Sequence, residues 1–247
     1  MRRGLGACVL ACACGRVGFD ATTGGTRDGS AGSDSELTGA IAWAGSFLAR
    51  DWGPGTTDTF SAQAHAAGNA FVLDLACHGT VVPTAVSLTA PGWTIDSLDP
   101  ITESPDGLFA SATFGAVAPD TAPVTFTVTW TGTPSCSAVS SELGDEFTAN
   151  DPTGGATTFE AHTQAAGTAN CTAGVTTAHA NDAMWGGCYT DDALTGVGAG
   201  YAKAGDDHDG DWSEYNVTTD PAGTAEQVRF VVSGSSSVTA AIAIKPR

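Results

Sequence analysis

The segment PVTFTVTW, from Pro123 to Trp130, is the feature that most constrains the fold of this chain. Apolar side chains at Val124, Phe126 and Val128 alternate with threonines, which is the period-two pattern of a β-strand with one buried face. Similar short runs recur from residue 40 to the end, with Gly, Pro, Asn and Asp in the gaps. The other strands that we expect span residues 70–78, 85–90, 108–114, 136–143, 172–179, 183–189, 212–217, 226–232 and 238–245.

So many short strands in one domain predict an all-β fold, a two-sheet antiparallel β-sandwich whose sheets pack face to face. Composition favours the same fold, because Gly, Thr, Ser, Ala and Val dominate and Lys plus Arg total 9. Phe71, Leu73 and Cys77 share one face of the strand at 70–78, so Cys77 should face the core. In the strand at 238–245, one face carries Val238, Ala240, Ile242 and Ile244, and the other only Thr239, Ala241, Ala243 and Lys245. Such small residues leave room for a neighbouring sheet or loop.

The first twenty residues, MRRGLGACVLACACGRVGFD, have the pattern of an export signal. Arg2 and Arg3 precede an apolar stretch that is too short to span a bilayer, and small residues lead to Cys14. The junction ACACGRVGFD resembles the lipobox of bacterial lipoproteins, in which a Cys is diacylated and becomes the new N-terminus. Cys14 is our candidate for this residue. Ala11 stands where a Leu is usual, three residues before Cys14, and Cys12, preceded by VLA, fits the consensus as well or better. An ordinary secretory signal is the other interpretation.

Residues 15–39 are rich in Gly, Ser and Asp and have few apolar side chains. Such a tract cannot offset its ordering entropy by burial, so we expect a flexible tether. The expected organisation is a lipoprotein signal peptide at 1–14, the tether at 15–39 and a β-sandwich domain at 40–247. The protein would then be exported and lipid-anchored at the bacterial cell envelope or surface.

The charge of the chain restricts its partners. Asp plus Glu total 27, and the formal net charge is −18 at pH 7. Nucleic acid and anionic membrane surfaces need Lys and Arg to replace their counterions, so neither is an expected partner, and membrane contact should come through the lipid anchor only. Solubility outside the cell explains the charge, and cation binding is the more specific alternative.

Four cysteines lie beyond the signal, namely Cys77, Cys136, Cys171 and Cys188. An even number in an exported domain indicates two disulfides, and the absence of a CxxC pair among them disfavours zinc. Three connectivities are open. We expect Cys77–Cys136, because these residues end and begin core strands, and Cys171–Cys188, because they flank two consecutive strands. Val139 and Leu143 fall on the opposite face from Cys136 unless the strand begins with a bulge, so the first pairing requires a bulge there.

A resemblance covers most of residues 60–246. The order AFVLDLACHG, TPSCSAVSSELGDEF, HANDAMWGGCYT and VTAAIAIKP is similar to a large group of uncharacterised jelly-roll domains of bacterial surface and secreted proteins. Glu142 takes the place of a Glu in the second motif, and Asn181-Asp182 that of an Asn-Glu pair in the third. The resemblance implies a concanavalin-like or jelly-roll sandwich, and it brings no activity with it.

The densest polar segment is GDDHDGDW, which ends at Trp212. Asp207, Asp209 and Asp211 alternate around Gly210 and resemble part of a calcium loop, where hard oxygen ligands surround a hard cation. The EF-hand spacing is not reproduced, and a solvated acidic turn is the alternative. Calcium is thus the candidate cofactor, with these three aspartates as its candidate ligands.

No recognisable motif identifies an enzyme. The five histidines do not reproduce the HExxH spacing, and there is no Gly-x-Ser-x-Gly elbow. The acidic residues are so numerous that a glycosidase pair could always be chosen, so that argument discriminates nothing. Glu142 and Glu214 lie within expected strands, and for Glu142 we favour a structural carboxylate that accepts hydrogen bonds.

Tryptophans supply the candidate ligand-binding residues. Trp130 and Trp185 lie within expected strands and should be core residues, whereas Trp52 and Trp93 lie beside turns and Trp212 follows the acidic segment. Exposed Trp near Asp suits sugar stacking combined with hydroxyl hydrogen bonds. The first interpretation is therefore a non-catalytic, lectin-like surface lipoprotein that binds a glycan or another surface polymer. A structural or adhesive surface subunit is the alternative, and an extracellular polysaccharide-acting enzyme is third.

We expect Cys14→Ser to release the protein from membranes, because the acylated residue is lost, whereas Cys12→Ser should leave it membrane-bound. Immunoblotting of membrane and soluble fractions measures this. Retention of the Cys14→Ser protein in the membrane fraction would contradict the assignment.

Overall fold

A computed structural model describes residues 41–52, 54–145, 158–167, 171–178, 182–190, 193–206, 211–217, 221–232 and 236–245. Cys14, the tether at 15–39 and two of the candidate calcium ligands, Asp207 and Asp209, lie outside the described residues. Leu37–Arg247 forms one compact unit. In the described ranges the secondary structure consists of sixteen β-strands, which confirms the all-β prediction. No helix in these ranges is long and apolar enough to cross a membrane.

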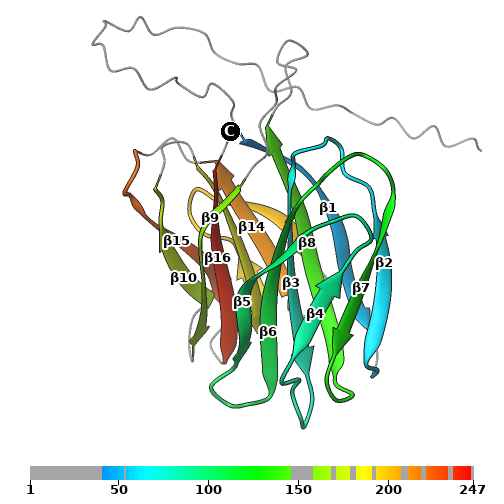
Figure 1. The fold of residues 1–247 in the computed structure, drawn as a ribbon. Helices are drawn as coiled ribbons and strands as arrows, with labels where there is room; N and C mark the ends of the chain where they lie inside the picture. The colour runs from blue at the N-terminus through cyan, green and yellow to red at the C-terminus, as the bar shows by residue number, and fades with distance from the viewer. Residues whose placement is uncertain are drawn as a thin grey trace, which may run out of the picture. The chain divides into compact units, whose positions relative to one another are not determined.

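Eight strands form the first half of the described structure. They are β1 (Ile41–Trp52), β2 (Thr57–Ala62), β3 (Ala70–His78), β4 (Val86–Thr89), β5 (Ile95–Glu103), β6 (Phe109–Val117), β7 (Val124–Trp130) and β8 (Ser135–Asp145). Their antiparallel pairing gives a five-stranded sheet in the order β1-β8-β3-β6-β5 and a three-stranded sheet in the order β2-β7-β4 (Figure 1).

Eight further strands form the second half. They are β9 (Thr158–Gly167), β10 (Cys171–Thr176), β11 (Ala183–Thr190), β12 (Leu194–Gly196), β13 (Ala202–Asp206), β14 (Asp211–Val217), β15 (Ala225–Val232) and β16 (Ser237–Lys245). Their sheets have the orders β13-β14-β11-β16-β9 and β10-β15-β12. Adding eight to every strand number of the first half reproduces both orders, so the second half repeats the architecture of the first.

The register of the central strands shows the same repeat. Ala70 at the start of β3 pairs with Val117 on one side and Leu143 on the other. Ala183 at the start of β11 likewise pairs with Val217 and Ile244. Positions of the two halves can therefore be matched through the hydrogen-bond ladders, residue 70 corresponding to residue 183.

The described residues form four sheets, so the predicted two-sheet sandwich is corrected to a four-layer arrangement. Each three-stranded sheet packs on a five-stranded sheet, and the two five-stranded sheets pack on each other. The central strands β3, β6, β11 and β16 are consequently buried along both faces over nearly their whole length. The alternation in PVTFTVTW, which indicates a strand with one buried face, predicts only two layers.

The contact between the five-stranded sheets is mainly apolar. Val72 and Leu143 from the first half pack with Trp185 and Ile242 from the second. All four side chains are fully buried. Each such burial contributes roughly 1.5–3 kcal/mol to folding, so the two halves stabilise one another. Trp185 thereby lies in the core, as the sequence predicted.

The last strand shows how one strand serves two cores. Ala240 and Ile242 of β16 face the other half, whereas Ala241 and Ala243 lie under the sheet β10-β15-β12. The small side chains at 241 and 243 allow that sheet to approach, with Val228 among the residues above them. The room that the sequence pattern indicated is thus filled by a sheet.

Two disulfides join the same cysteine pairs that the sequence analysis expected. Cys77 and Cys136 lie directly opposite each other on β3 and β8. Cys171 of β10 is bonded to Cys188 of β11. No bulge is needed in β8, because both of its faces are buried: Cys136 faces one core and Val139 the other.

A buried carboxylate lies where the two five-stranded sheets meet. Asp74 is 3% exposed, and its Oδ1 accepts hydrogen bonds from Ser111 Oγ at 2.7 Å and Thr113 Oγ1 at 3.1 Å. Its matched position in the second half is Gly187, and a Cβ there would come within 2.7 Å of Asp74 Oδ2. The matched positions therefore meet, and only glycine leaves room for the carboxylate. Burial raises the pKa of Asp74 to about 6, although the hydroxyl donors oppose the shift.

We predict that the free energy of unfolding falls as the pH rises from about 4 to about 7. The pKa of Asp74 is about 6 in the folded chain against 3.8 when unperturbed, so its stabilising contribution is complete below 3.8 and is lost as the pH passes 6. The full effect is on the order of 3 kcal/mol. Urea unfolding across this pH range measures it, and Asp74→Asn should make the profile shallower without flattening it, because the raised pKa of Glu214 acts in the same direction. The exposed control Asp96→Asn should keep the wild-type slope, and equal slopes in all three proteins would refute the assignment.

Candidate functional site

A pocket of about 300 Å³ opens at one end of the sheet β2-β7-β4. The loop after β4 and the loop before β7 form its walls, and these loops meet because β4 and β7 are antiparallel neighbours. The lining residues are Pro91, Gly92, Trp93, Pro119, Asp120, Ala122, Pro123, Val124 and Thr125.

Trp93 is held in the pocket wall by a tight turn and by packing. Its backbone N–H donates to the carbonyl oxygen of Ala90 at 3.2 Å, and Gly92 takes the positive φ of 81° that this turn needs. The indole packs edge-on against Phe71 and Phe126, with ring centroids 6.0 and 5.2 Å away. The ring is only partly buried. Trp93 is therefore a partly buried aromatic residue that is packed against the core and lines the pocket.

Asp120 supplies the carboxylate of the pocket. Its Oδ1 accepts a hydrogen bond from the backbone N–H of Ala122 at 2.8 Å, which fixes the side chain within its own loop. Within the described ranges, no group donates to the second carboxylate oxygen, and the residue is exposed. That oxygen can accept hydrogen bonds from a ligand beside Trp93.

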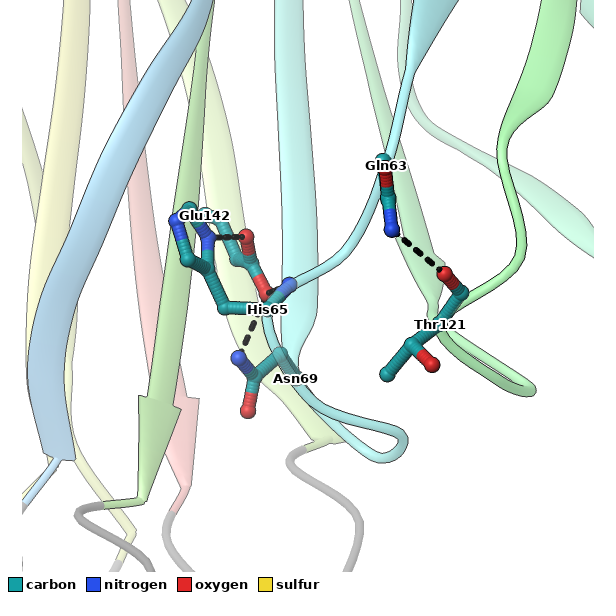
Figure 2. Close-up of polar contacts among 5 residues, drawn as sticks. All are labelled: Gln63, His65, Asn69, Thr121 and Glu142. Carbon is teal, nitrogen blue, oxygen red and sulfur yellow. Dashed lines mark hydrogen bonds and ion pairs between the residues drawn. The ribbon is translucent and has the colours of Figure 1, made fainter.

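The loop that carries Asp120 is tied to the segment that follows β2. Gln63 Nε2 donates to the carbonyl oxygen of Thr121 at 3.1 Å, as Figure 2 shows. Gln63 comes immediately after the end of β2 at Ala62. This contact connects the pocket wall to the strand at the edge of the same sheet.

A buried carboxylate anchors that same segment further along (Figure 2). Glu142 on β8 is 1% exposed. Its Oε1 accepts hydrogen bonds from the backbone N–H of His65 at 2.9 Å and from Asn69 Nδ2, while its Oε2 lies 2.7 Å from His65 Nδ1. Glu142 is thus a structural carboxylate, as the sequence analysis favoured. Glu142 therefore fixes the segment after β2 to the core, and Gln63 in the same segment holds the loop of the pocket wall.

The tryptophans predicted to bind ligand are not brought together. Trp93 lines the pocket, whereas Trp52 ends β1 opposite Cys136 and Trp212 lies on β14 in the second half. The Trp212 ring is partly buried, and Lys203 Nζ lies 3.4 Å from its centroid. Trp212 therefore packs against a cation of its own sheet instead of lining the pocket.

Glu214, the other carboxylate that the sequence singled out, is also structural. It is fully buried on β14 and accepts hydrogen bonds from the backbone N–H groups of Gly198 at 2.7 Å and Arg229 at 2.9 Å. The strand β12 pairs with β15 only at Val231 and Val232, so it does not reach the backbone N–H of Arg229. The Glu214 carboxylate accepts that hydrogen bond in place of a paired strand. Burial raises the pKa of Glu214 to about 7.

The proposed calcium ligands are only partly within the described structure. Asp211 begins β14, and Asp207 and Asp209 lie outside the described residues. Among the side chains that the structure does describe, no group of three or more His, Cys, Asp or Glu is placed to hold a metal ion. Calcium binding by the 207–211 segment stays a prediction.

Comparison with known proteins found no family model, curated protein or solved structure that matches this chain. The function is therefore argued from the pocket itself. Sequence reasoning missed Asp120 as a site residue. The available signal was the turn sequence APDTA, which directly precedes the segment PVTFTVTW.

We predict that Glu142→Ala lowers the free energy of unfolding by about 2 kcal/mol, because it leaves the buried amide of Asn69 without its acceptor and removes two hydrogen bonds to His65, whose side chain is exposed. Gln63→Ala is the matched control, because it removes a hydrogen bond of the same segment and this hydrogen bond is exposed to solvent. It should cost less than about 1 kcal/mol. Urea unfolding of both variants tests this, and equal small losses would show that Glu142 does not anchor the segment.

Proposed function

We propose that this protein is a non-catalytic glycan-binding protein of the bacterial surface, exported and held there by a lipid on Cys14. The observation that carries the proposal is the partly exposed ring of Trp93 in a pocket that also presents the Asp120 carboxylate. A sugar offers an apolar C–H face and a rim of hydroxyls, which match an indole face and a carboxylate acceptor. The two side chains thus complement the two kinds of surface on a sugar ring.

The pocket is suited to a small part of a glycan. A volume of about 300 Å³ is at the lower end of ligand pockets, which corresponds to one or two sugar rings. Phe71 and Phe126 hold the indole in place, so little ordering entropy is lost when a sugar stacks on it. Among the lining residues Asp120 is the one carboxylate, whereas glycoside hydrolysis uses a pair. This supports binding in preference to cleavage.

We further propose that each half is a jelly roll. In the first half, the pairs β1–β8, β2–β7 and β3–β6 are nested, and in the second half β9–β16, β10–β15 and β11–β14 are nested in the same way. Nested pairing of eight strands over two sheets is the pattern expected of a jelly roll. The four segments that carried the family resemblance contain the strands β3, β8, β11 and β16, which are central or next to central in the five-stranded sheets.

Export is supported by the two disulfides. Such bonds persist mainly in oxidising compartments outside the cytosol. The lipid anchor rests on the sequence around Cys14, and calcium assistance rests on Asp207, Asp209 and Asp211. Both are parts of the proposal that need their own experiments.

We predict that Trp93→Ala lowers the affinity for a neutral oligosaccharide at least tenfold, because the stacking surface is lost. A glycan array, run with and without calcium, identifies an oligosaccharide that binds and tests the role of the 207–211 segment.

Calorimetric titration with that oligosaccharide then measures the affinity. Trp212→Phe, which alters a partly buried tryptophan outside the pocket, should bind like the wild type, and unchanged melting temperatures verify folding. Wild-type affinity of the Trp93→Ala protein would refute the site.

A further inference from the structure

The outer face of the sheet β2-β7-β4 is covered by hydroxyl side chains. Along each strand these residues alternate with residues that face the core, such as Phe60 and Phe126. They are exposed, apart from Thr127, which is partly buried. The set consists of Thr57, Thr59 and Ser61 on β2, Thr125, Thr127 and Thr129 on β7, and Ser87 and Thr89 on β4.

The register of the sheet arranges these hydroxyls in rows. Thr57 and Ser87 both pair with Thr129, and the next row along the strands is centred on Thr127. Neighbouring strands are about 4.8 Å apart and residues two apart on a strand are about 6.8 Å apart, so the rows form a regular grid. Thr57 Oγ1 donates to the carbonyl oxygen of Val128 at 2.9 Å, which fixes its orientation.

This face is uncharged. None of the eight side chains carries a charge, although the chain contains 27 Asp and Glu. A grid of hydroxyls and methyls matches a neutral polyhydroxylated ligand, which can exchange hydrogen bonds with the hydroxyls and contact the methyls. An anionic polymer would find no cation here.

The equivalent sheet of the second half provides an internal comparison. β15 takes the place of β7, and its exposed residues include Gln227, Arg229 and Val231 instead of threonines. The two sheets share strand order and exposure, so the preference of threonine for strands does not by itself produce the hydroxyl grid. The outer strands of the second-half sheet do carry Thr172, Thr176 and Thr195, but its middle strand carries none. Among the described residues, a continuous grid of hydroxyls is therefore found only in the half that contains the Trp93 pocket.

Thr125 connects the grid to the pocket, because it lines the pocket and also begins the row of threonines on β7. We propose that the pocket and the hydroxyl face form one binding surface for an extended, neutral polysaccharide. One sugar ring stacks on Trp93, and the following sugars lie along the threonines of β7. Thr125 to Thr129 spans about 14 Å, which accommodates further rings beyond the first. This inference rests on the proposed function of the pocket.

Titration of the full chain with neutral gluco- and manno-oligosaccharides of increasing length tests the inference. We expect the affinity to rise with length by roughly tenfold before it levels off, which corresponds to one or two added hydrogen bonds. Thr127→Val combined with Thr129→Val should remove this gain and leave the affinity for the shortest ligand unchanged. Valine keeps the shape of threonine, so the strand is retained. Thr172→Val on β10 of the second half is the matched control and should behave like the wild type.

The outcomes separate the two proposals. Affinity that is independent of length but still lost in Trp93→Ala overturns the extended surface and leaves the pocket intact. A length gain that survives the double valine variant also overturns it. Absence of binding to every oligosaccharide in the series defeats the proposed glycan-binding function and this inference with it.

Discussion

The burial of two five-stranded sheets against one another is the constraint on which the rest of the structure depends. Every central strand must satisfy two cores at once, so β3 presents Phe71 and Leu73 to the outer sheet and Val72 to the other half. Polar groups in this contact need partners within it, which Ser111 and Thr113 provide for Asp74. The residue opposite the Asp74 carboxylate on the other sheet is Gly187. Any larger residue there would come too close to the carboxylate, so the two sheets can pack closely only with glycine at this position.

Because the inner faces are used for mutual burial, the outer three-stranded sheets are left to face solvent. The first of them is held at its pocket end by a series of contacts that begins at the buried Glu142 and reaches the pocket wall through Gln63 (Figure 2). Trp93 is fixed separately by Phe71 and Phe126. A rigid aromatic ring and a rigid carboxylate loop are the features of a preformed site, in which binding energy is not spent on ordering the protein.

The strands β7 and β15 could be predicted from the sequence because apolar and polar residues alternate along them. The strands β3, β6, β11 and β16, which are buried on both faces, are runs of apolar and small residues between turn signals. The strands that were missed, β1, β2, β5, β9, β12 and β13, all lie at sheet edges, where one side lacks a partner and polar residues weaken the pattern. The repeat of the two halves was hidden because matched positions differ in chemistry, with Glu142 corresponding to Ala243 and Phe114 to Glu214. Trp93 could be found from its turn, but the hydroxyl grid depends on register between strands distant in sequence.

We propose that a glycan binds at Trp93 without rearrangement of the buried cores. The most direct measurement is the NMR signal of the tryptophan indole N–H groups during titration with a neutral oligosaccharide. We expect the Trp93 signal to move while the signals of Trp130 and Trp185, which are buried in the cores, stay in place. A shift confined to Trp212, or shifts of the core tryptophans with Trp93 unchanged, would contradict it.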